Sequence, residues 1–395
     1  MVASSHSSAE PAPPLSGLRV LELGQYIAAP AAGQLLADLG ADVIKLEPAS
    51  GDAARSLGWT RDAYGPMFSA YNRGKRSVVF DLRSEAGRAQ AKALALASDV
   101  VLANARPGAL EKQGLGASEL LASAPKMVYG RVSAFGQSGP ASKRAGFDIA
   151  AQAESGMMSL NGEAGLPPVR VGFTAVDLLS AQMLATGVLA ALVRRGVTGR
   201  GGLVDLSLID VAVAALANAW TEYRQSGRMP VRRGNGQPTV APAAEVVHTR
   251  DGMVVLSAYT EPHFARLCTT IGQPELAQDP RFSTNQARVT HRVELMEVLT
   301  RALSRFDSDE LVDMLADGGI VAGTIRDMSQ IRPGHAGVSA DLFVDVSAPD
   351  RAAISVPGLP LQMDGVRRRA ARLPSLGEHT DEVLAELRQR AAQES

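Results

Sequence analysis

The sequence predicts an α/β fold, in which a doubly wound, mostly parallel sheet forms a large domain and a smaller α+β domain follows. Three observations predict this class. Short apolar strands alternate with helices from residue 18, and 395 residues exceed the size at which one core stops growing. A segment rich in Gly, Pro and Arg at 224–243 also interrupts the second half as a linker. We therefore expect two domains.

The first half of the chain alternates strands and helices. It begins with the apolar strand 18–23 and the helix 29–40, which Gly40 ends. Further strands are expected at 41–47, 77–82, 99–104 and 126–136, and further helices at 84–98 and 117–124. Strands joined in this way take right-handed crossovers, with helices on both faces of a parallel sheet. Such sheets bind ligands outside the carboxyl ends of their strands.

In the second half of the chain, the sequence predicts longer helices and a hairpin. Two apolar helices are expected at 177–195 and 205–224, separated by the glycines of 197–202. A β-hairpin at 244–259 turns on Asp251-Gly252. The remaining expected elements are helices at 261–272, 286–305 and 308–318, a strand within 352–363, and a last helix from about 379.

Composition excludes several classes of protein. The 40 Lys and Arg against 41 Asp and Glu leave a net charge of −1, whereas a general nucleic-acid binder carries a basic excess. The single cysteine, Cys268, can form neither an internal disulfide nor a thiolate metal site. The six histidines show no ligand spacing, so no metal site is expected. One cysteine fits the reducing cytoplasm.

Neither a secretion signal nor a membrane span is expected. Residues 1–14 lack the basic and apolar regions of a signal peptide and predict a disordered tail. The apolar run 175–193 approaches the length of a membrane span, but it contains Asp177, Ser180 and Gln182. We therefore interpret this run as a buried helix.

Basic residues at strand ends point to an anionic ligand. The chain has no dinucleotide fingerprint, Walker loop, His-Glu-x-x-His or Gly-x-Ser-x-Gly motif. Instead, "NRGKRS" (72–77) precedes a strand, Arg83 follows it, and "NARPGALEK" (104–112) follows the next strand. Arg and Lys at this edge of the sheet could clamp phosphates.

One carboxylate, Asp177, stands at the head of the apolar helix. It could be an N-cap, because Asp accepts hydrogen bonds from the free amides of a first turn. It could also be a nucleophile or base, kept ionised by those amides and by the helix dipole. The two interpretations are compatible, and position alone does not separate them.

Eight segments resemble the class III CoA-transferase and racemase family, which includes formyl-CoA transferase, carnitine CoA-transferase and α-methylacyl-CoA racemase. The segments run in order over residues 14–387. They are "PLSGLRVLELGQYIAAPAAGQLLADLGADVIKLEP" (14–48), "YNRGKRSVVFDL" (71–82), "NARPGALEKQGLG" (104–116), "FGQSGP" (135–140), "AGFDIAAQAESGMMSLNGE" (145–163), "DLSLID" (205–210), "DPRFSTNQARVTHR" (279–292) and "LGEHTDEVLAEL" (376–387).

The resemblance implies a domain layout. After the tail at 1–14, it implies a Rossmann-like CoA-binding domain at 15–225 and a small α+β domain at 226–330. Residues 331–395 are then a linker and a C-terminal segment that returns to the large domain. The family also implies a homodimer whose two subunits interlock like links of a chain.

The activity that the resemblance implies is CoA transfer. CoA passes from an acyl-CoA donor, such as succinyl-CoA, to a carboxylic acid acceptor through an aspartyl anhydride and an aspartyl-CoA thioester on Asp177. CoA thioesters are thus substrates, and no permanently bound cofactor is implied. The implied partners are the donor, the acceptor and a second copy of the chain, with neither nucleic acid nor membrane.

Phe147 favours the transferase branch over the racemases. Family racemases resemble this chain around 145–150 but carry His directly before the Asp, where this chain has Phe147. That His is the second proton carrier of the racemases, and a phenyl ring cannot accept a proton. The alternative function is a 2-methylacyl-CoA racemase or epimerase.

Further site residues are carried over from the family by position. The CoA contacts fall on Ala28, Phe80, Leu82, Arg83, Asn104, Arg106 and Lys112. The substrate contacts fall on Gln25, Tyr26, Phe147, Gly236 and Gln237. Arg170 and the pair Arg232 and Arg233 are candidates to hold the distal carboxylate of a dicarboxylic acceptor.

Overall fold

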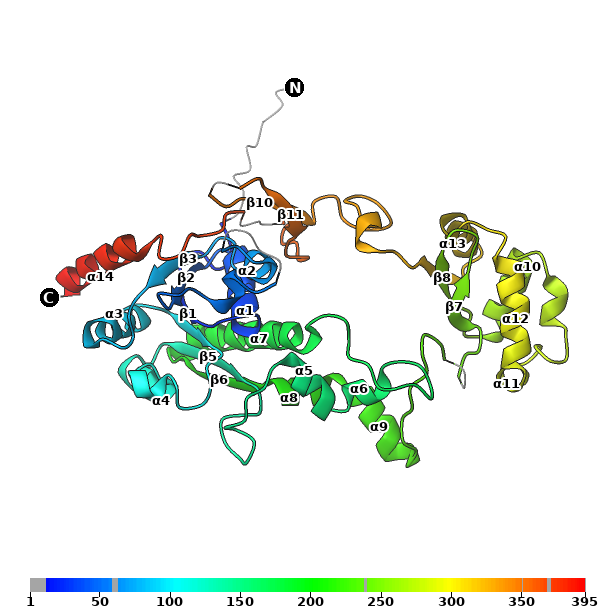
Figure 1. Ribbon diagram of the computed structural model, residues 1–395, viewed down its shortest axis with the longest axis horizontal. Helices are drawn as coiled ribbons and strands as arrows, with labels where there is room; N and C mark the ends of the chain where they lie inside the picture. The colour runs from blue at the N-terminus through cyan, green and yellow to red at the C-terminus, as the bar shows by residue number, and fades with distance from the viewer. Residues whose placement is uncertain (1–11, 59–62, 238–239, 350, 368–370, 395) are drawn as a thin grey trace, which may run out of the picture. The chain divides into compact units, whose positions relative to one another are not determined.

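Short apolar runs form a six-stranded parallel sheet in the computed structural model (Figure 1). The strands are β1 (Arg19–Leu23), β2 (Asp42–Glu47), β3 (Arg76–Val79), β4 (Val100–Ala103), β5 (Val128–Ser133) and β6 (Gly202–Ser207). Their order is β3-β2-β1-β4-β5-β6, and each neighbouring pair is parallel. The predicted parallel sheet is confirmed. Its strand order reverses between β1 and β4, the point at which doubly wound sheets bind ligands.

Side chains along each strand point alternately into two cores. On β1, Val20 lies in the core shared with helices α1 (Ala28–Asp38) and α7 (Ala175–Thr198). Its neighbour Leu21 lies in the core shared with α3 (Glu85–Leu96), α4 (Ala117–Ser123) and α14 (Thr380–Glu394). Because side chains alternate along a strand, helices cover both faces of the sheet.

The prediction of a single helix at 205–224 is wrong. Strand β6 continues to Ser207 and pairs with β5, and helix α8 (Leu208–Ala215) begins only after it. Ser207 caps α8 by accepting a hydrogen bond from the Asp210 amide at 3.1 Å. A further helix, α9 (Ala217–Ser226), completes the segment. The apolar residues that suggested one long helix therefore belong to an edge strand and two helices.

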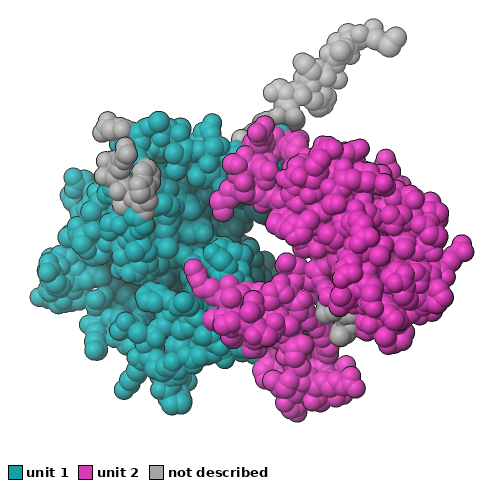
Figure 2. Space-filling model, turned by 45° about the vertical axis from the view of Figure 1, so that its right-hand side comes forward, with its two compact units in different colours: residues 1–157, 171–217, 337–395 teal, residues 158–170, 218–336 magenta. Residues whose placement is uncertain are grey.

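The chain divides into two compact units (Figure 2). Unit 1 comprises residues 1–157, 171–217 and 337–395, and unit 2 comprises residues 158–170 and 218–336. The structure describes residues 12–58, 63–237, 240–349, 351–367 and 371–394. The expected disordered tail at 1–14 thus lies almost wholly outside the described residues.

Unit 1 also contains shorter elements outside the large sheet. They include helices α2 (Pro66–Tyr71) and α5 (Asp148–Glu154), the 3₁₀ turns η1 (Ala53–Arg55) and η2 (Glu111–Gln113), and an antiparallel pair of strands, β10 (Phe343–Val346) and β11 (Ile354–Pro357). Helix α6 (Met157–Leu160) stands where the chain passes from unit 1 to unit 2.

Unit 2 has its own apolar core. The predicted hairpin is confirmed as the antiparallel strands β7 (Ala244–His248) and β8 (Met253–Ser257), and β9 (Val321–Thr324) pairs with β8. Helices α10 (Glu261–Thr270), α12 (Arg292–Leu303) and α13 (Ser308–Asp317) pack on this sheet. The predicted helix at 286–305 is interrupted at His291, so that a short helix, α11 (Asn285–Thr290), precedes α12.

Helix α7 is long and apolar enough to cross a membrane, with a mean hydropathy of 1.8. Within unit 1, however, one of its faces packs on the sheet. Ala181, Leu184 and Val188 are buried in the core shared with β1, β4 and β5. Because this face is committed to the sheet, α7 is a core helix of unit 1.

Candidate active site

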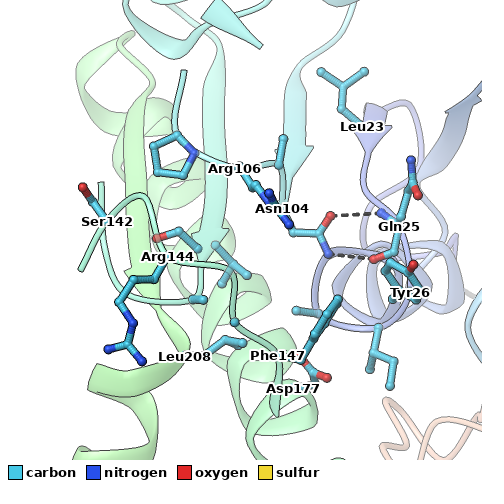
Figure 3. A pocket seen from close by; sticks show the side chains of 18 residues that line it. Leu23, Gln25, Tyr26, Asn104, Arg106, Ser142, Arg144, Phe147, Asp177 and Leu208 are labelled. Atoms are coloured by element: carbon cyan, nitrogen blue, oxygen red, sulfur yellow. Dashed lines mark hydrogen bonds between the residues drawn. The ribbon is translucent and has the colours of Figure 1, made fainter. Parts of the chain in front are cut away.

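A cavity of about 420 Å³ opens where the strand order of the sheet reverses (Figure 3). Its lining comes from residues of 23–28 after β1, of 104–107 after β4, of 132–134 at the end of β5 and of 142–147 before α5, with Asp177 and Leu208. All of these residues belong to unit 1. The cavity therefore lies at the edge where a doubly wound sheet is expected to bind its ligand.

The Asn104 side chain joins the two loops that flank the reversal. Its Oδ1 accepts a hydrogen bond from the Gln25 amide at 2.9 Å, and its Nδ2 donates to the Gln25 carbonyl at 2.7 Å. Figure 3 shows both bonds between Asn104 and Gln25. An amide is suited to this position because it donates and accepts at the same time.

Tyr26 has a left-handed backbone, with φ of 64°, which is unusual for an aromatic residue. Asp52 supports this conformation, since its Oδ1 accepts hydrogen bonds from the Tyr26 amide at 3.2 Å and the Ala54 amide at 2.9 Å. The Tyr26 ring meets Phe147 edge-on, with centroids 5.7 Å apart. Together the two rings form an aromatic wall of the cavity, which Asp177 also lines.

Asp177 is not the N-cap of α7. The N-cap position belongs to Thr174, whose side chain makes no capping bond, and Asp177 stands in the first turn. Asp148 of α5 supplies the cap instead. Its Oδ2 accepts hydrogen bonds from the Val176 amide at 2.8 Å and from the Asp177 amide at 3.2 Å. The capping interpretation of Asp177 is therefore wrong, and the role belongs to a carboxylate 29 residues upstream.

The expectation that helix amides keep Asp177 ionised is also wrong. Burial, followed by the negative charge of Asp148, raises the pKa of Asp177 to about 7. Burial, followed by the negative charge of Asp177, likewise raises the pKa of Tyr71. Asp177 is thus a carboxyl group that exchanges its proton near neutral pH, in a cavity, which is a common property of catalytic acids and nucleophiles.

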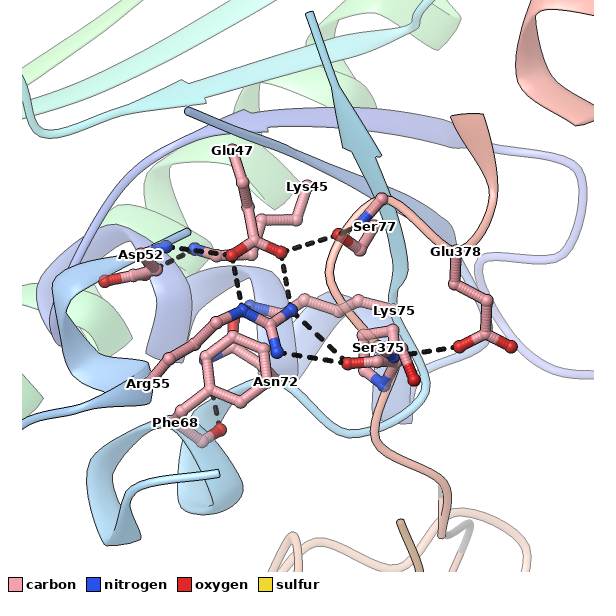
Figure 4. A network of polar contacts seen from close by, with 12 residues as sticks. Lys45, Glu47, Asp52, Arg55, Phe68, Asn72, Lys75, Ser77, Ser375 and Glu378 are labelled. Carbon is pink, nitrogen blue, oxygen red and sulfur yellow. Dashed lines mark hydrogen bonds and ion pairs between the residues drawn. The ribbon is translucent and has the colours of Figure 1, made fainter. Parts of the chain in front are cut away.

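A buried cluster of charged side chains contacts the residues that follow β1, and Figure 4 labels its members Lys45, Asp52 and Lys75. Lys45 Nζ contacts Glu22 Oε1, Asp52 Oδ2 and the carbonyl oxygen of Gly24, each at 2.8 Å. Lys75 Nζ donates to Glu22 Oε2 at 2.6 Å and to Asn72 Oδ1 at 2.9 Å. Because Lys45 holds both the Gly24 carbonyl and Asp52, the cluster fixes the loop that carries Gln25 and Tyr26.

Charges inside the cluster alter each other's protonation. The carboxylates Glu22, Asp52 and Glu47 outweigh the effect of burial and raise the pKa of Lys45 to about 12. Burial, with the repulsion of Lys45, lowers the pKa of Lys75 to about 8. Gly33 of α1 leaves room for this arrangement, since a Cβ at residue 33 would lie 2.1 Å from Glu22 Oε2.

The structure brings together part of the predicted CoA contacts. Ala28, Asn104 and Arg106 line the cavity. Phe80 is buried in the core beneath α3, and Leu82 packs against that core. Arg83 is exposed and paired with Asp81, and Lys112 is exposed on η2. These last four residues do not line the cavity, so a contact with CoA would fall outside it.

Of the predicted substrate contacts, Gln25, Tyr26 and Phe147 line the cavity. Gly236 and Gln237 belong to unit 2, where the Gln237 side chain donates a hydrogen bond to the Tyr259 hydroxyl. Their role remains a prediction. Of the candidate arginines, Arg232 donates to the Leu166 carbonyl at 2.7 Å, and Arg233 lies 3.6 Å from Glu222.

Several residues of the site were not predicted from the sequence. Ser142 and Arg144 line the cavity, and Arg144 also pairs with Glu154 and lies 4.6 Å from the Phe135 ring centroid. Asp148 accepts a hydrogen bond from the Asp177 amide, and Asp52 accepts one from the Tyr26 amide. The charge of Asp177 contributes to the raised pKa of Tyr71, after burial. Asp148 directly follows Phe147 in the sequence, but the burial of its side chain, which points to its role, is visible only in the structure.

The fold and the cavity define an α/β enzyme with a titratable carboxyl at its switch point, and comparison with known proteins gives its family. A family profile described as CoA-transferase family III matches residues 15–380. The succinate–glutarate CoA-transferase of Agrobacterium fabrum is 38% identical over 384 residues, which cover 95% of this chain and 96% of that protein. The succinyl-CoA–D-citramalate CoA-transferase of Chloroflexus aurantiacus is 38% identical over 390 residues, covering 96% of each.

Solved structures agree with this assignment. A CaiB/BaiF family protein from Brucella suis superposes with a TM-score of 0.86 at 34% identity, covering 95% of this chain and all of that one. The chain belongs to CoA-transferase family III, the CaiB/BaiF family, and it is a CoA-transferase. The transferase names of its relatives agree with what Phe147 indicated.

Proposed function

We propose that this enzyme moves CoA from succinyl-CoA or a similar acyl-CoA donor to a dicarboxylic acid acceptor, with Asp177 as the nucleophile. The observation that carries the proposal is the position of the Asp177 carboxyl, which lines the switch-point cavity and exchanges its proton near neutral pH. A carboxylate of raised pKa in a cavity is suited to covalent catalysis.

The reaction proceeds by exchange between carboxylates and thioesters. The Asp177 carboxylate attacks the donor thioester carbon, so that a C–O bond forms, the C–S bond breaks and CoA leaves as a thiolate. The thiolate attacks the Asp177 carbonyl of the resulting anhydride, releases the donor acid and leaves an aspartyl-CoA thioester. The acceptor carboxylate repeats the two steps in reverse, and Asp177 regains its free carboxylate. Each tetrahedral oxyanion requires nearby hydrogen-bond donors.

The residues of the cavity support this chemistry. Helix α1 begins at Ala28 on the cavity wall, and first-turn amides have no acceptor within their own helix. The Tyr26 and Phe147 rings give the cavity an apolar surface in the same lining as Asp177. Phe147 also offers no second base for racemisation.

Two arginines support a dicarboxylic acceptor. Arg106 and Arg144 line the same cavity as Asp177, and a guanidinium binds a carboxylate through paired hydrogen bonds. The named activities of the similar transferases also involve dicarboxylic acids, namely succinate, glutarate and citramalate. One carboxylate of the acceptor would react at Asp177 while the other pairs with an arginine.

We also propose that the chain forms the interlocked homodimer of its family and acts in the cytoplasm. Helix α7 leaves apolar side chains uncovered in the single chain, with Val193 72% and Val197 85% exposed. A second copy that covers these side chains would account for them. Light scattering coupled to size exclusion should then give twice the chain mass, whereas a monomer at working concentration would contradict the dimer.

The function is tested with a panel of carboxylic acids. Purified enzyme is incubated with succinyl-CoA and each acid, and new CoA thioesters are measured by mass spectrometry. We expect transfer to C4–C6 dicarboxylates and little to monocarboxylates of the same length, with at least a 10³-fold loss in Asp177→Asn. Absence of transfer to every acid, or full activity in Asp177→Asn, would contradict the proposal.

A further inference from the structure

Two carboxylates meet the N-terminus of α7, and their positions differ. Asp148 is 3% exposed and accepts the amides of Val176 and Asp177. Asp177 projects from the same turn and lines the cavity. The helix N-terminus is an anion-binding position, and here it is occupied by a carboxylate from another helix.

Gln152 fixes Asp148 in this position. The Gln152 Nε2 donates to Asp148 Oδ1 at 2.5 Å, and Gln152 Oε1 accepts from the Val171 amide at 2.8 Å. Two residues one turn apart on α5 therefore hold both segments: Asp148 binds the start of α7, and Gln152 binds the segment before it. A buried carboxylate with three donors has a well-defined position, which a cap at a flexible surface turn lacks.

We infer that Asp148 is a positioning residue for the nucleophile: it takes the helix amides that would otherwise stabilise the Asp177 carboxylate and sets a second negative charge beside it. This inference rests on the proposed role of Asp177 as the nucleophile. The Asp177 carboxylate is consequently held in place by its helix but poorly stabilised, which favours attack on a thioester.

The reason lies in the movement of charge during the attack. In the free enzyme two negative charges repel each other across the first turn of α7. As Asp177 attacks, its charge passes to the former thioester oxygen, and the anhydride that results is neutral at Asp177. The repulsion is therefore relieved in the transition state, and an interaction that is less unfavourable there accelerates the step. The raised pKa of Asp177 is consistent with this repulsion.

Other groups also face Asp177. Helix α2 contributes Tyr71, whose pKa is raised by burial and then by the negative charge of Asp177. From the loops after β4 and before α5 come Arg106 and Arg144, which line the same cavity. Of these two arginines Arg144 is already paired with Glu154, whereas the charge of Asp148 disfavours the ionised form of Asp177. Replacing Asp148 by a neutral residue removes the second of the two causes that raise the pKa of Asp177, while the larger one, burial, remains.

The test is Asp148→Asn, because the Asn side chain still accepts hydrogen bonds from an N-terminal turn but carries no charge. We expect the acid limb of kcat/KM against pH to move down, and to stay above the pH range of an ordinary carboxyl because the burial of Asp177 remains. We also expect kcat on the plateau to fall about tenfold, since a less basic carboxylate is a weaker nucleophile, with KM for the donor within twofold. An acid limb that stays in place, in a variant with native circular dichroism, would overturn the inference.

Two controls make the result specific. Asp327 caps the exposed turn η4 (Met328–Gln330) by accepting the amides of Ser329 and Gln330, so Asp327→Asn is the same change away from the cavity. It should leave the pH profile unchanged. If Asp148→Asn does not fold, Asp148→Ser keeps an uncharged acceptor at the cap, and it should give the same downward shift. Absence of that shift would overturn the inference.

The two proposals can fail separately. Hydroxylamine trapping on wild-type enzyme reports whether Asp177 carries the acyl or CoA group at all. Trapped Asp177 with an unchanged acid limb in Asp148→Asn would reject the role of Asp148 and leave the proposed function standing. Untrapped Asp177 during turnover would reject both.

Discussion

Asp148 accepts a hydrogen bond from the backbone amide of Asp177, so the two carboxyl groups share one helix N-terminus. This arrangement affects the ionised forms of the two residues in opposite ways. Asp148 receives the stabilisation that a helix N-terminus gives to an anion, whereas Asp177 receives its repulsion. The four predictions that follow, and the closing measurement, test the site that this arrangement creates.

The pH dependence of activity should follow the ionisation of Asp177. Only the carboxylate can attack, and burial together with Asp148 raises its pKa to about 7. We therefore expect kcat/KM to rise with pH, with a midpoint near 7, and to reach about one-tenth of its plateau at pH 6. An ordinary carboxyl would be fully ionised there. A profile flat between pH 5 and 8 would show that no group of raised pKa limits the attack.

Asp177→Asn should be more stable than the wild type at alkaline pH. Since the pKa of Asp177 is higher in the folded chain than in the unfolded one, the folded state loses stability as pH rises from about 4 to about 7. Removing the charge should therefore raise the free energy of unfolding by roughly 2–4 kcal/mol at pH 8, and by nothing below pH 4. Urea denaturation at both pH values measures this.

A control for that measurement is Asp279→Asn. Hydrogen bonds from Arg281 lower the pKa of Asp279, so its carboxylate stabilises the fold at neutral pH and loses this effect as pH falls through the lowered pKa. Asp279→Asn should therefore reduce stability slightly at pH 8. Stabilisation by both changes would mean that the effect of Asp177→Asn reflects total charge and not its buried carboxyl.

Lys45→Met should destabilise the chain strongly and weaken substrate binding. The change removes the lysine paired with the buried Asp52, takes one of its two lysines from Glu22, and frees the Gly24 carbonyl. We expect a loss of about 3–5 kcal/mol in unfolding free energy and a rise in KM for the acyl-CoA. Lys92→Met removes the exposed pair with Glu119 and should cost less than about 1 kcal/mol, with KM unchanged. Equal losses for the two variants would contradict a structural role of the cluster.

The enzyme should not exchange the α-proton of an acyl-CoA. Phe147 lines the cavity, and its phenyl ring cannot take up a proton. In D₂O, with 2-methylacyl-CoA and no acceptor acid, deuterium at the α-carbon should match that seen with Asp177→Asn. Faster wash-in by the wild type would instead support a racemase.

The sequence predicted the sheet well because its signals are local. On β1 and β2, the pairs Val20-Leu21 and Val43-Ile44 each send one side chain to each core, and short apolar runs of this kind are typical of strands covered on both faces. Strand β6 was missed because its residues 202–207 precede an apolar helix directly, and its pairing with β5 comes from residues over 70 positions upstream.

Single residues of the site could be predicted from the sequence, but the hydrogen bonds and ion pairs between distant segments could not. Asp177, Phe147 and residues after β1 and β4 were each predicted as site residues, and they line one cavity. That Asp148 would take the cap of α7 depends on α5 and α7 meeting in space, which no spacing within either segment encodes. The same holds for the ion cluster, where Lys75 reaches Glu22 from 53 residues away.

The measurement that tests the account most directly is covalent trapping at Asp177. Wild-type enzyme is mixed with succinyl-CoA and hydroxylamine, digested, and its peptides are sequenced by mass spectrometry. We predict a hydroxamate on Asp177 that forms only when donor is present and is absent from the Asp177→Asn protein, with Asp148 unmodified. Full turnover with Asp177 unmodified, or a hydroxamate on another carboxylate, would contradict Asp177 as the nucleophile.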